Sequence, residues 1–119
     1  MTHKRFCITK EKTMTTKKVP SKHYNELKKS YPGLFDAHEQ LGSQLRQSGP
    51  LDEKTLQLIQ LAAAGATGAE GAVHSHTRRA LTAGASAEEI YHALIILMST
   101  IGFPKVMAAL SWCRDIIEE

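Results

Sequence analysis

The sequence is poor in aromatic residues, long apolar runs and cysteine, and each shortage excludes a class of protein. Aromatic residues make up 6% of the chain, and Val, Ile and Tyr form no alternating runs, so we expect no β-sheet. No apolar run reaches the length of a membrane span, and the N-terminus lacks the apolar segment of a signal peptide. Because Cys7 and Cys113 lie far apart, free thiols fit better than a disulfide. We therefore expect a cytoplasmic protein that does not act at a membrane.

The positive charge is concentrated at the N-terminus. The formal net charge of +3 divides into +5 over residues 1–18, with six basic residues and one acidic, and −2 over the remainder, with nine basic and eleven acidic. We expect residues 1–18 to be a disordered basic leader and residues 19–119 to form a single domain. The mildly acidic body gives no support for nucleic-acid binding.

Helical signals occupy the rest of the chain. Alanine is abundant, and apolar residues recur at helical spacing between Gly and Pro stop signals, which predicts an all-α bundle of five or six helices. We expect these helices near residues 21–30, 34–47, 52–64, 69–83, 86–98 and 104–117. Ser21, Asp52 and Ser86 are the predicted N-caps, and Glu89 completes a capping box with Ser86. The apolar segment of residues 90–98 predicts a helix that is deeply buried or lies in a subunit interface.

The helix predicted at residues 69–83 gathers the candidate chemistry. Glu70 and His74 are four residues apart and share one face. His76 lies nearly opposite, on the apolar side, so we expect a buried imidazole. It could act as a general acid or base, or it could be a core histidine bonded to a carbonyl group.

The other polar residues of this helix give weaker signals. Arg78 and Arg79 could bind a carboxylate substrate, or they could be solvated or paired with acidic residues of a neighbouring subunit. Only Glu70 and His74 could chelate a metal ion together, which is part of a site at most, so we predict no metal site. Cys113 lies in an apolar helical pattern and is expected to pack in the core.

One long motif carries a family resemblance. The run GAEGAVHSHTRRALTAGASAEEI, followed by IGFP, resembles the carboxymuconolactone decarboxylase family, which also contains alkyl-hydroperoxidase D. The resemblance covers roughly residues 36–119. It implies an all-helical bundle of the alkyl-hydroperoxidase D-like type, assembled into trimers or hexamers, with buried sites near subunit contacts.

The two branches of the family imply different chemistry. In the peroxidase branch a Cys-x-x-Cys pair precedes the histidine and a relay glutamate lies one helix earlier. The cysteine positions match Ala69 and Ala72, and the glutamate position matches Gln57, so only His76 remains. The decarboxylase branch also lacks the cysteines and is the more similar, although its acidic residue four positions before the histidine is Ala72 here.

The resemblance therefore predicts cofactor-free decarboxylation of a small carboxylated lactone or related cyclic acid by a homo-oligomer. His76 would transfer the proton, and Glu70 and His74 would orient it or the substrate. The predicted substrate-binding residues are Arg78, Arg79, Gln57 and Phe103. The alternatives are a peroxidase-like antioxidant activity and a non-catalytic binding or assembly protein on the same scaffold.

Overall fold

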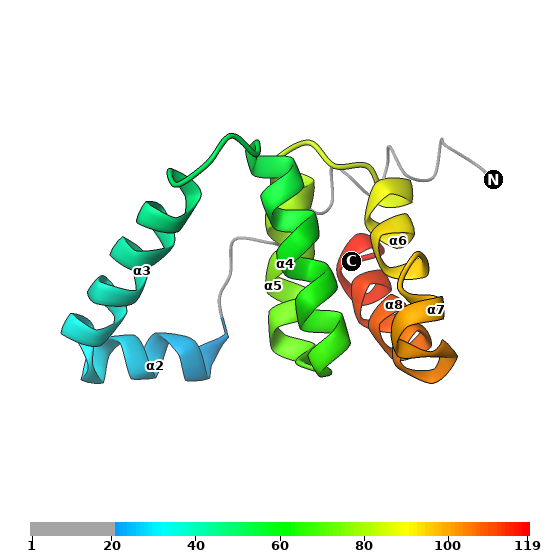
Figure 1. The fold of residues 1–119 in the computed structure, drawn as a ribbon. Helices are drawn as coiled ribbons and strands as arrows, with labels where there is room; N and C mark the ends of the chain where they lie inside the picture. Colours follow the sequence, from blue (N-terminus) through cyan, green and yellow to red (C-terminus); the bar gives the residue numbers. More distant parts are fainter. Residues whose placement is uncertain (1–20) are drawn as a thin grey trace.

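The computed structural model describes residues 21–119, and every regular element in this range is a helix (Figure 1). The predicted leader, residues 1–18, and Cys7 lie outside the described residues. The helices are α2 (Lys22–Ser30), α3 (Pro32–Arg46), α4 (Glu53–Thr67), α5 (Glu70–Thr82), α6 (Ala87–Ile95), α7 (Met98–Ile101) and α8 (Phe103–Ile117). The predicted all-α fold is confirmed for this part of the chain. None of its helices is both long and apolar enough to cross a membrane.

Helices α2, α4 and α6 begin where local sequence signals predict, and α4 ends at a predicted glycine. The side chains of Ser21 and Asp52 each accept a hydrogen bond from a backbone N–H of the following first turn. Ser86 and Glu89 form the predicted capping box, with bonds of 3.0 and 2.9 Å. Gly68 ends α4 in the left-handed conformation, with a φ of 71°, which residues with a Cβ rarely adopt.

The segment of residues 86–98 is broken, whereas one continuous helix was predicted. Helix α6 ends at Ile95, and a separate single turn, α7, follows it. Burial is also one-sided: Ile90 and Leu94 are fully buried, but Ile95 and Ile96 are 46% and 64% exposed. Some apolar residues of this segment therefore pack in the core, and others lie on an exposed surface.

The core lies between α4, α5, α6 and α8, which pack closely on one another. Its largest fully buried apolar side chains are Leu61, Val73, Ile90, Leu94, Val106, Cys113, Ile116 and Ile117. Gly65 is buried inside α4, which continues past it to Thr67. A Cβ added there would lie 2.9 Å from Leu94 Cδ2 and 3.2 Å from Ala109 Cβ. The missing side chain thus lets α4 approach α6 and α8 closely.

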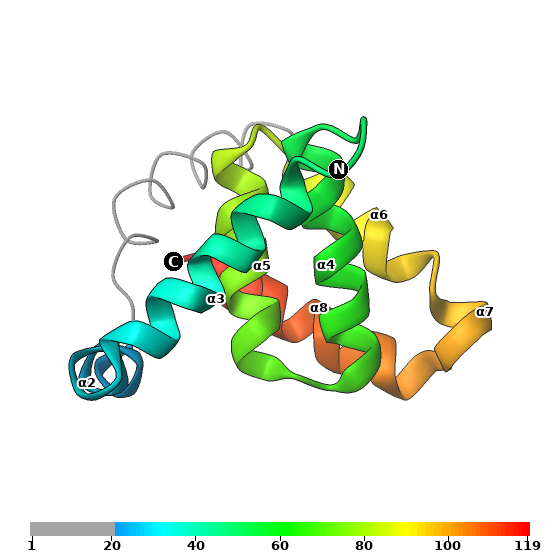
Figure 2. The same ribbon diagram turned by 60° about the vertical axis from the view of Figure 1, so that its left-hand side comes forward.

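Helices α2 and α3 stand beside this core rather than within it, on the side of α4 and α5 (Figure 1 and Figure 2). The two helices pack through an edge-to-face contact of Tyr24 and Phe35, whose ring centroids are 5.2 Å apart. The apolar residues of α3 that show helical spacing are not covered: Leu34, Leu41 and Leu45 are 65%, 54% and 58% exposed. The described chain therefore leaves an apolar face on α3 in contact with solvent.

Candidate functional site

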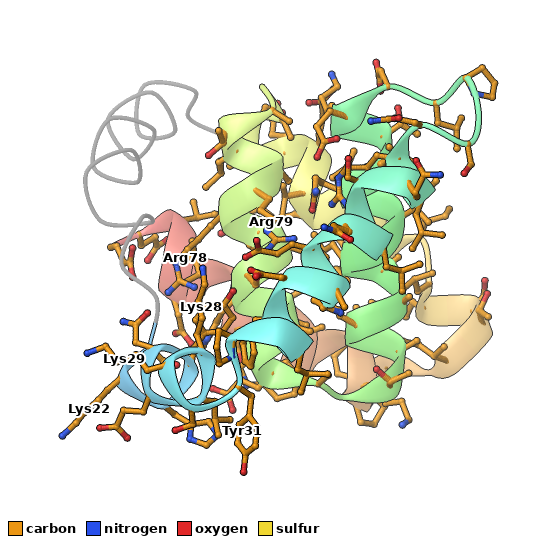
Figure 3. All side chains as sticks on the ribbon, turned by 90° about the vertical axis from the view of Figure 1, so that its left-hand side faces the viewer. Lys22, Lys28, Lys29, Tyr31, Arg78 and Arg79 are labelled. Carbon is orange, nitrogen blue, oxygen red and sulfur yellow. The ribbon has the colours of Figure 1, made fainter. Side chains whose placement is uncertain are left out.

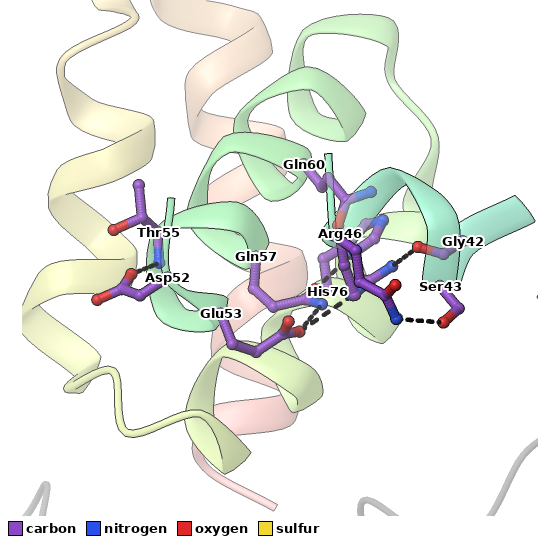
Figure 4. A network of polar contacts seen from close by, with 10 residues as sticks. Gly42, Ser43, Arg46, Asp52, Glu53, Thr55, Gln57, Gln60 and His76 are labelled. Carbon is purple, nitrogen blue, oxygen red and sulfur yellow. Dashed lines mark hydrogen bonds and ion pairs between the residues drawn. The ribbon is translucent and has the colours of Figure 1, made fainter. Parts of the chain in front are cut away.

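His76 lies on α5 with its ring half-buried and turned toward α4 (Figure 4). Its Nδ1 is 2.9 Å from Oε1 of Gln57, a residue of α4 that is only 1% exposed. The imidazole was expected to be buried, but the structure leaves it only half-buried. The partner of His76 is a side-chain amide, not the backbone carbonyl group of an ordinary core histidine.

A chain of hydrogen bonds fixes the direction of the Gln57 amide. Gln57 Nε2 donates to Glu53 Oε2 at 2.7 Å, and that carboxylate can only accept. The amide oxygen of Gln57 must then face His76, and because this oxygen also only accepts, Nδ1 of the ring carries the hydrogen. Neutral His76 is thereby held as the Nδ1–H tautomer, and its Nε2 keeps a free lone pair.

Arg46, at the end of α3, closes the chain of hydrogen bonds. Its Nε donates to Glu53 Oε2 at 3.3 Å, and its terminal nitrogens donate to Gln60 Oε1 and to the carbonyl oxygen of Gly42, both at 3.2 Å. The same carboxylate thus accepts from both Arg46 and Gln57 (Figure 4). Arg46 therefore links the position of α3 to the polar network of His76.

The electrostatic surroundings of His76 favour the neutral ring. Burial lowers its pKa from 6.5, and the positive charges of Arg79 and Arg46 lower it further. The hydrogen bond from Gln57, and after it the contact with Arg46, lower the pKa of Glu53 despite its partial burial. A carboxylate at one end of the network and a neutral imidazole at the other are the states expected near neutral pH.

Arg79 is the predicted substrate-binding residue best placed for that role. It is exposed, and its guanidinium makes no hydrogen bond or ion pair within residues 21–119. Lys22, Lys28 and Lys29 of α2 are seen on the same side of the molecule as Arg79 (Figure 3). Arg79 therefore offers an unpaired guanidinium whose positive charge also acts on His76.

Arg78 and Phe103 contribute to other parts of the molecule. A terminal nitrogen of Arg78 lies 3.9 Å from Glu119 Oε2, and its Nε is buried without a hydrogen-bond partner in the described chain. Phe103 starts α8, is 58% exposed and takes no part in the polar network of His76. Their predicted contacts with substrate stay predictions.

Glu70 and His74 belong to a different cluster from His76. His74 Nε2 lies 3.1 Å from Asp115 Oδ2 on α8, and one ligand atom from each of Glu70, His74 and Asp115 lies within 4.8 Å of the others. No hydrogen bond in residues 21–119 connects Glu70 or His74 to His76. The shared face of Glu70 and His74 is as expected, but their orienting role at His76 has no direct contact to support it.

Cys113 is held as a thiol in the core. It is fully buried, and its Sγ is 3.2 Å from Thr77 Oγ1. Burial raises its pKa to about 11. Cys113 thus packs as expected and provides no thiolate near neutral pH.

The part of the chain that is similar to a known protein family runs from α3 into α8. The model of the carboxymuconolactone decarboxylase family matches residues 32–115. The chain belongs to this family. Its site histidine, His76, lies inside the matched range.

Two uncharacterized proteins are similar to this member of the carboxymuconolactone decarboxylase family. One, from Methanocaldococcus jannaschii, is 29% identical over 98 residues, which cover 82% of this chain and 92% of the relative. The other, from Haemophilus influenzae, is 39% identical over 75 residues, which cover 63% of each chain. No solved structure matches significantly.

Sequence reasoning named Gln57 but missed Glu53, Arg46 and Asp115. Glu53 and Gln57 are four residues apart on α4, a spacing that signals contact between their side chains. Arg46 and Asp115 carry no such signal, because each meets its partners across a contact between helices. Membership of the carboxymuconolactone decarboxylase family draws attention to His76 and Gln57 but does not by itself reveal Glu53, Arg46 or Asp115.

Proposed function

We propose that this chain is a cofactor-free carboxy-lyase that acts on a small carboxylated lactone or related cyclic acid, with His76 as the proton-transfer residue. One observation carries the proposal: Glu53 and Gln57 hold His76 by Nδ1, and Nε2 has no hydrogen-bond partner in residues 21–119. Family membership supports the same reaction class.

Arg79 and His76 have different roles in the reaction. Arg79 binds the substrate carboxylate, and the negative charge of the substrate beside the ring raises the pKa of His76, opposing the effect of the two arginines. The ring then takes up a proton from solvent at Nε2. When the carbon–carbon bond to the carboxylate breaks, carbon dioxide leaves and its electron pair remains on the ring carbon skeleton as an enolate. His76 donates its Nε2 proton to this enolate, which balances the proton that decarboxylation consumes.

Peroxide reduction is a weaker candidate on the described residues. Ala69 and Ala72 occupy the positions where the peroxidase branch has its cysteines, and Cys113 is buried with a pKa of about 11. A peroxidase needs an accessible thiolate, and residues 21–119 offer none.

The test is carbon dioxide release from a panel of carboxylated lactones by the full chain. We expect His76→Ala to keep its helical circular dichroism and to lose about 10² to 10⁴-fold in turnover. His92→Ala, which changes an exposed histidine of α6, is the matched control and should retain full turnover. Equal activity in His76→Ala would remove the assignment. Lactone binding without carbon dioxide release by the wild-type chain would favour the non-catalytic alternative.

We also propose that the chain forms homo-oligomers in which a second copy covers the leucines of α3. These side chains are more than half exposed and follow one helical stripe. The position of Arg46 at the end of the same helix would bring this contact close to the network of His76. The mass measured by light scattering coupled to size exclusion distinguishes a trimer from a hexamer.

A further inference from the structure

We propose that Glu70, His74 and Asp115 form a binding site for a divalent transition-metal ion, with Zn²⁺ as the reference ion. Two of these residues lie one turn apart on α5, and the third comes from α8, which packs against α5. The site shares no residue with the network of His76, so it does not depend on the proposed decarboxylation.

The distances suit a metal ion after small side-chain movements. The three ligand atoms lie within 4.8 Å of one another, and His74 Nε2 and Asp115 Oδ2 are 3.1 Å apart. Nitrogen and oxygen ligands bind Zn²⁺ at about 2.0 to 2.2 Å, which places neighbouring ligand atoms about 3 to 4 Å apart. Glu70 and Asp115 are exposed, so rotation of their side chains can close the remaining gap.

The backbone beneath the site is fixed by the core. Val73, directly before His74, is fully buried, and its carbonyl oxygen accepts a 2.7 Å bond from Thr77 Oγ1. The same hydroxyl lies 3.2 Å from Cys113 Sγ on α8. These buried contacts join α5 to α8 close to all three ligands, so ion binding requires no rearrangement of the helices.

The charges around the site favour a cation. Glu70 has no hydrogen bond or ion pair within residues 21–119, and the contact of Asp115 is with the imidazole of His74. The nearby cations face other carboxylates: Arg78 lies 3.9 Å from Glu119, and Arg114 lies 3.8 Å from Glu118. Two carboxylates beside one imidazole thus remain available to a doubly charged ion.

The donor set selects the class of metal. One imidazole nitrogen with two carboxylate oxygens suits Zn²⁺, Co²⁺, Mn²⁺ or Fe²⁺, whereas Ca²⁺ and Mg²⁺ prefer oxygen ligands throughout. Three protein ligands at an exposed position leave room for water in the remaining coordination positions.

The experiment is titration of the full chain with Co²⁺, followed by its visible absorption, and then displacement of Co²⁺ by Zn²⁺. We expect the wild-type chain to bind one Co²⁺. His74→Ala and Asp115→Asn should bind Co²⁺ at least about tenfold more weakly, or not at all. His92→Ala should bind as the wild type does. Zn²⁺ should also raise the melting temperature of the wild type and of His92→Ala, but not that of His74→Ala.

Two results would overturn the site. Unchanged Co²⁺ affinity in both His74→Ala and Asp115→Asn would place any bound ion elsewhere. Absence of a saturable Co²⁺ absorption change, together with absence of a Zn²⁺-dependent rise in melting temperature in the wild-type chain, would show that these three residues do not form the site. Neither result bears on His76, because turnover of a carboxylated lactone is measured separately.

Discussion

The oxygen of the Gln57 side-chain amide lies 2.9 Å from Nδ1 of His76, and a carboxylate behind it decides which way that amide points. Gln57 is therefore a positioning residue: it sets the tautomer of His76 and leaves Nε2 without a hydrogen-bond partner in residues 21–119. The following predictions concern this pair, the charges beside it and the packing that holds it.

Gln57→Glu should raise the pKa of His76. A carboxylate at this place would lie beside Nδ1 and stabilise the imidazolium ion, whereas the neutral amide of the wild type does not. The His76 ring resonances in an NMR pH titration measure this shift. Gln44→Glu, at an exposed position of α3, is the control and should leave the midpoint unchanged. A midpoint for Gln57→Glu equal to that of the wild type would contradict this prediction.

His76 should make the folded chain less stable at acid pH. Its pKa is lowered from 6.5 in the folded state, so the unfolded chain binds more protons as the pH falls. The stability that the neutral ring contributes is complete above pH 6.5 and is lost as the pH falls through 6.5 toward the folded pKa. Urea unfolding over about pH 5 to 8 should therefore show a smaller loss of stability in His76→Gln than in the wild type. If His92→Gln lost as little stability at acid pH as His76→Gln, the pH dependence could not be assigned to His76.

Arg79→Ala should weaken binding of the carboxylated substrate. Its unpaired guanidinium is the proposed partner of the substrate carboxylate, and a charged hydrogen bond of this kind changes KM by about tenfold or more. Arg79→Lys should recover part of the loss, because it keeps the charge but not the two-point contact. Steady-state kinetics measures both variants. If Arg79→Ala kept the wild-type KM, Arg79 would not be the residue that binds the substrate carboxylate.

Gly65→Ala should destabilise the fold. The added methyl group would press against Leu94 and Ala109, at 2.9 and 3.2 Å, and overpacking of this kind costs about 1 to 3 kcal/mol. Gly71→Ala is the matched control: no atom lies within 4 Å of an added Cβ, so only helix propensity acts and the variant should be as stable as the wild type or more so. Chemical unfolding gives both free energies. Equal free energies of unfolding for the two variants would mean that the core accommodates a methyl group at Gly65 without loss of stability.

Leu41→Arg should shift the chain toward the monomer. Leu41 lies in the exposed apolar stripe of α3, where a buried charge without a partner would oppose contact with a second copy. Light scattering coupled to size exclusion measures the mass. Gln40→Arg, an exposed neighbour on the same helix, should leave the mass unchanged. If the wild type is already a monomer, α3 is not a contact between copies.

Local interactions made the helices predictable from sequence. A cap such as Ser86 with Glu89 joins residues three apart, and Gly68 ends α4 through its own backbone freedom. The sequence also singled out His76 and placed Glu70 on the face of His74, since both follow from the geometry of one helix. All of these depend on residues within about one turn of each other.

The partners of those residues were decided by tertiary structure. Gln57 meets His76 across 19 positions of the chain, and Asp115 meets His74 across 41. The exposure of the leucines on α3 is of the same kind, because helical spacing shows that a face is apolar but not whether anything covers it. Which side chains meet depends on how α4, α5 and α8 pack, and that packing is a collective result of the whole core rather than of any one segment.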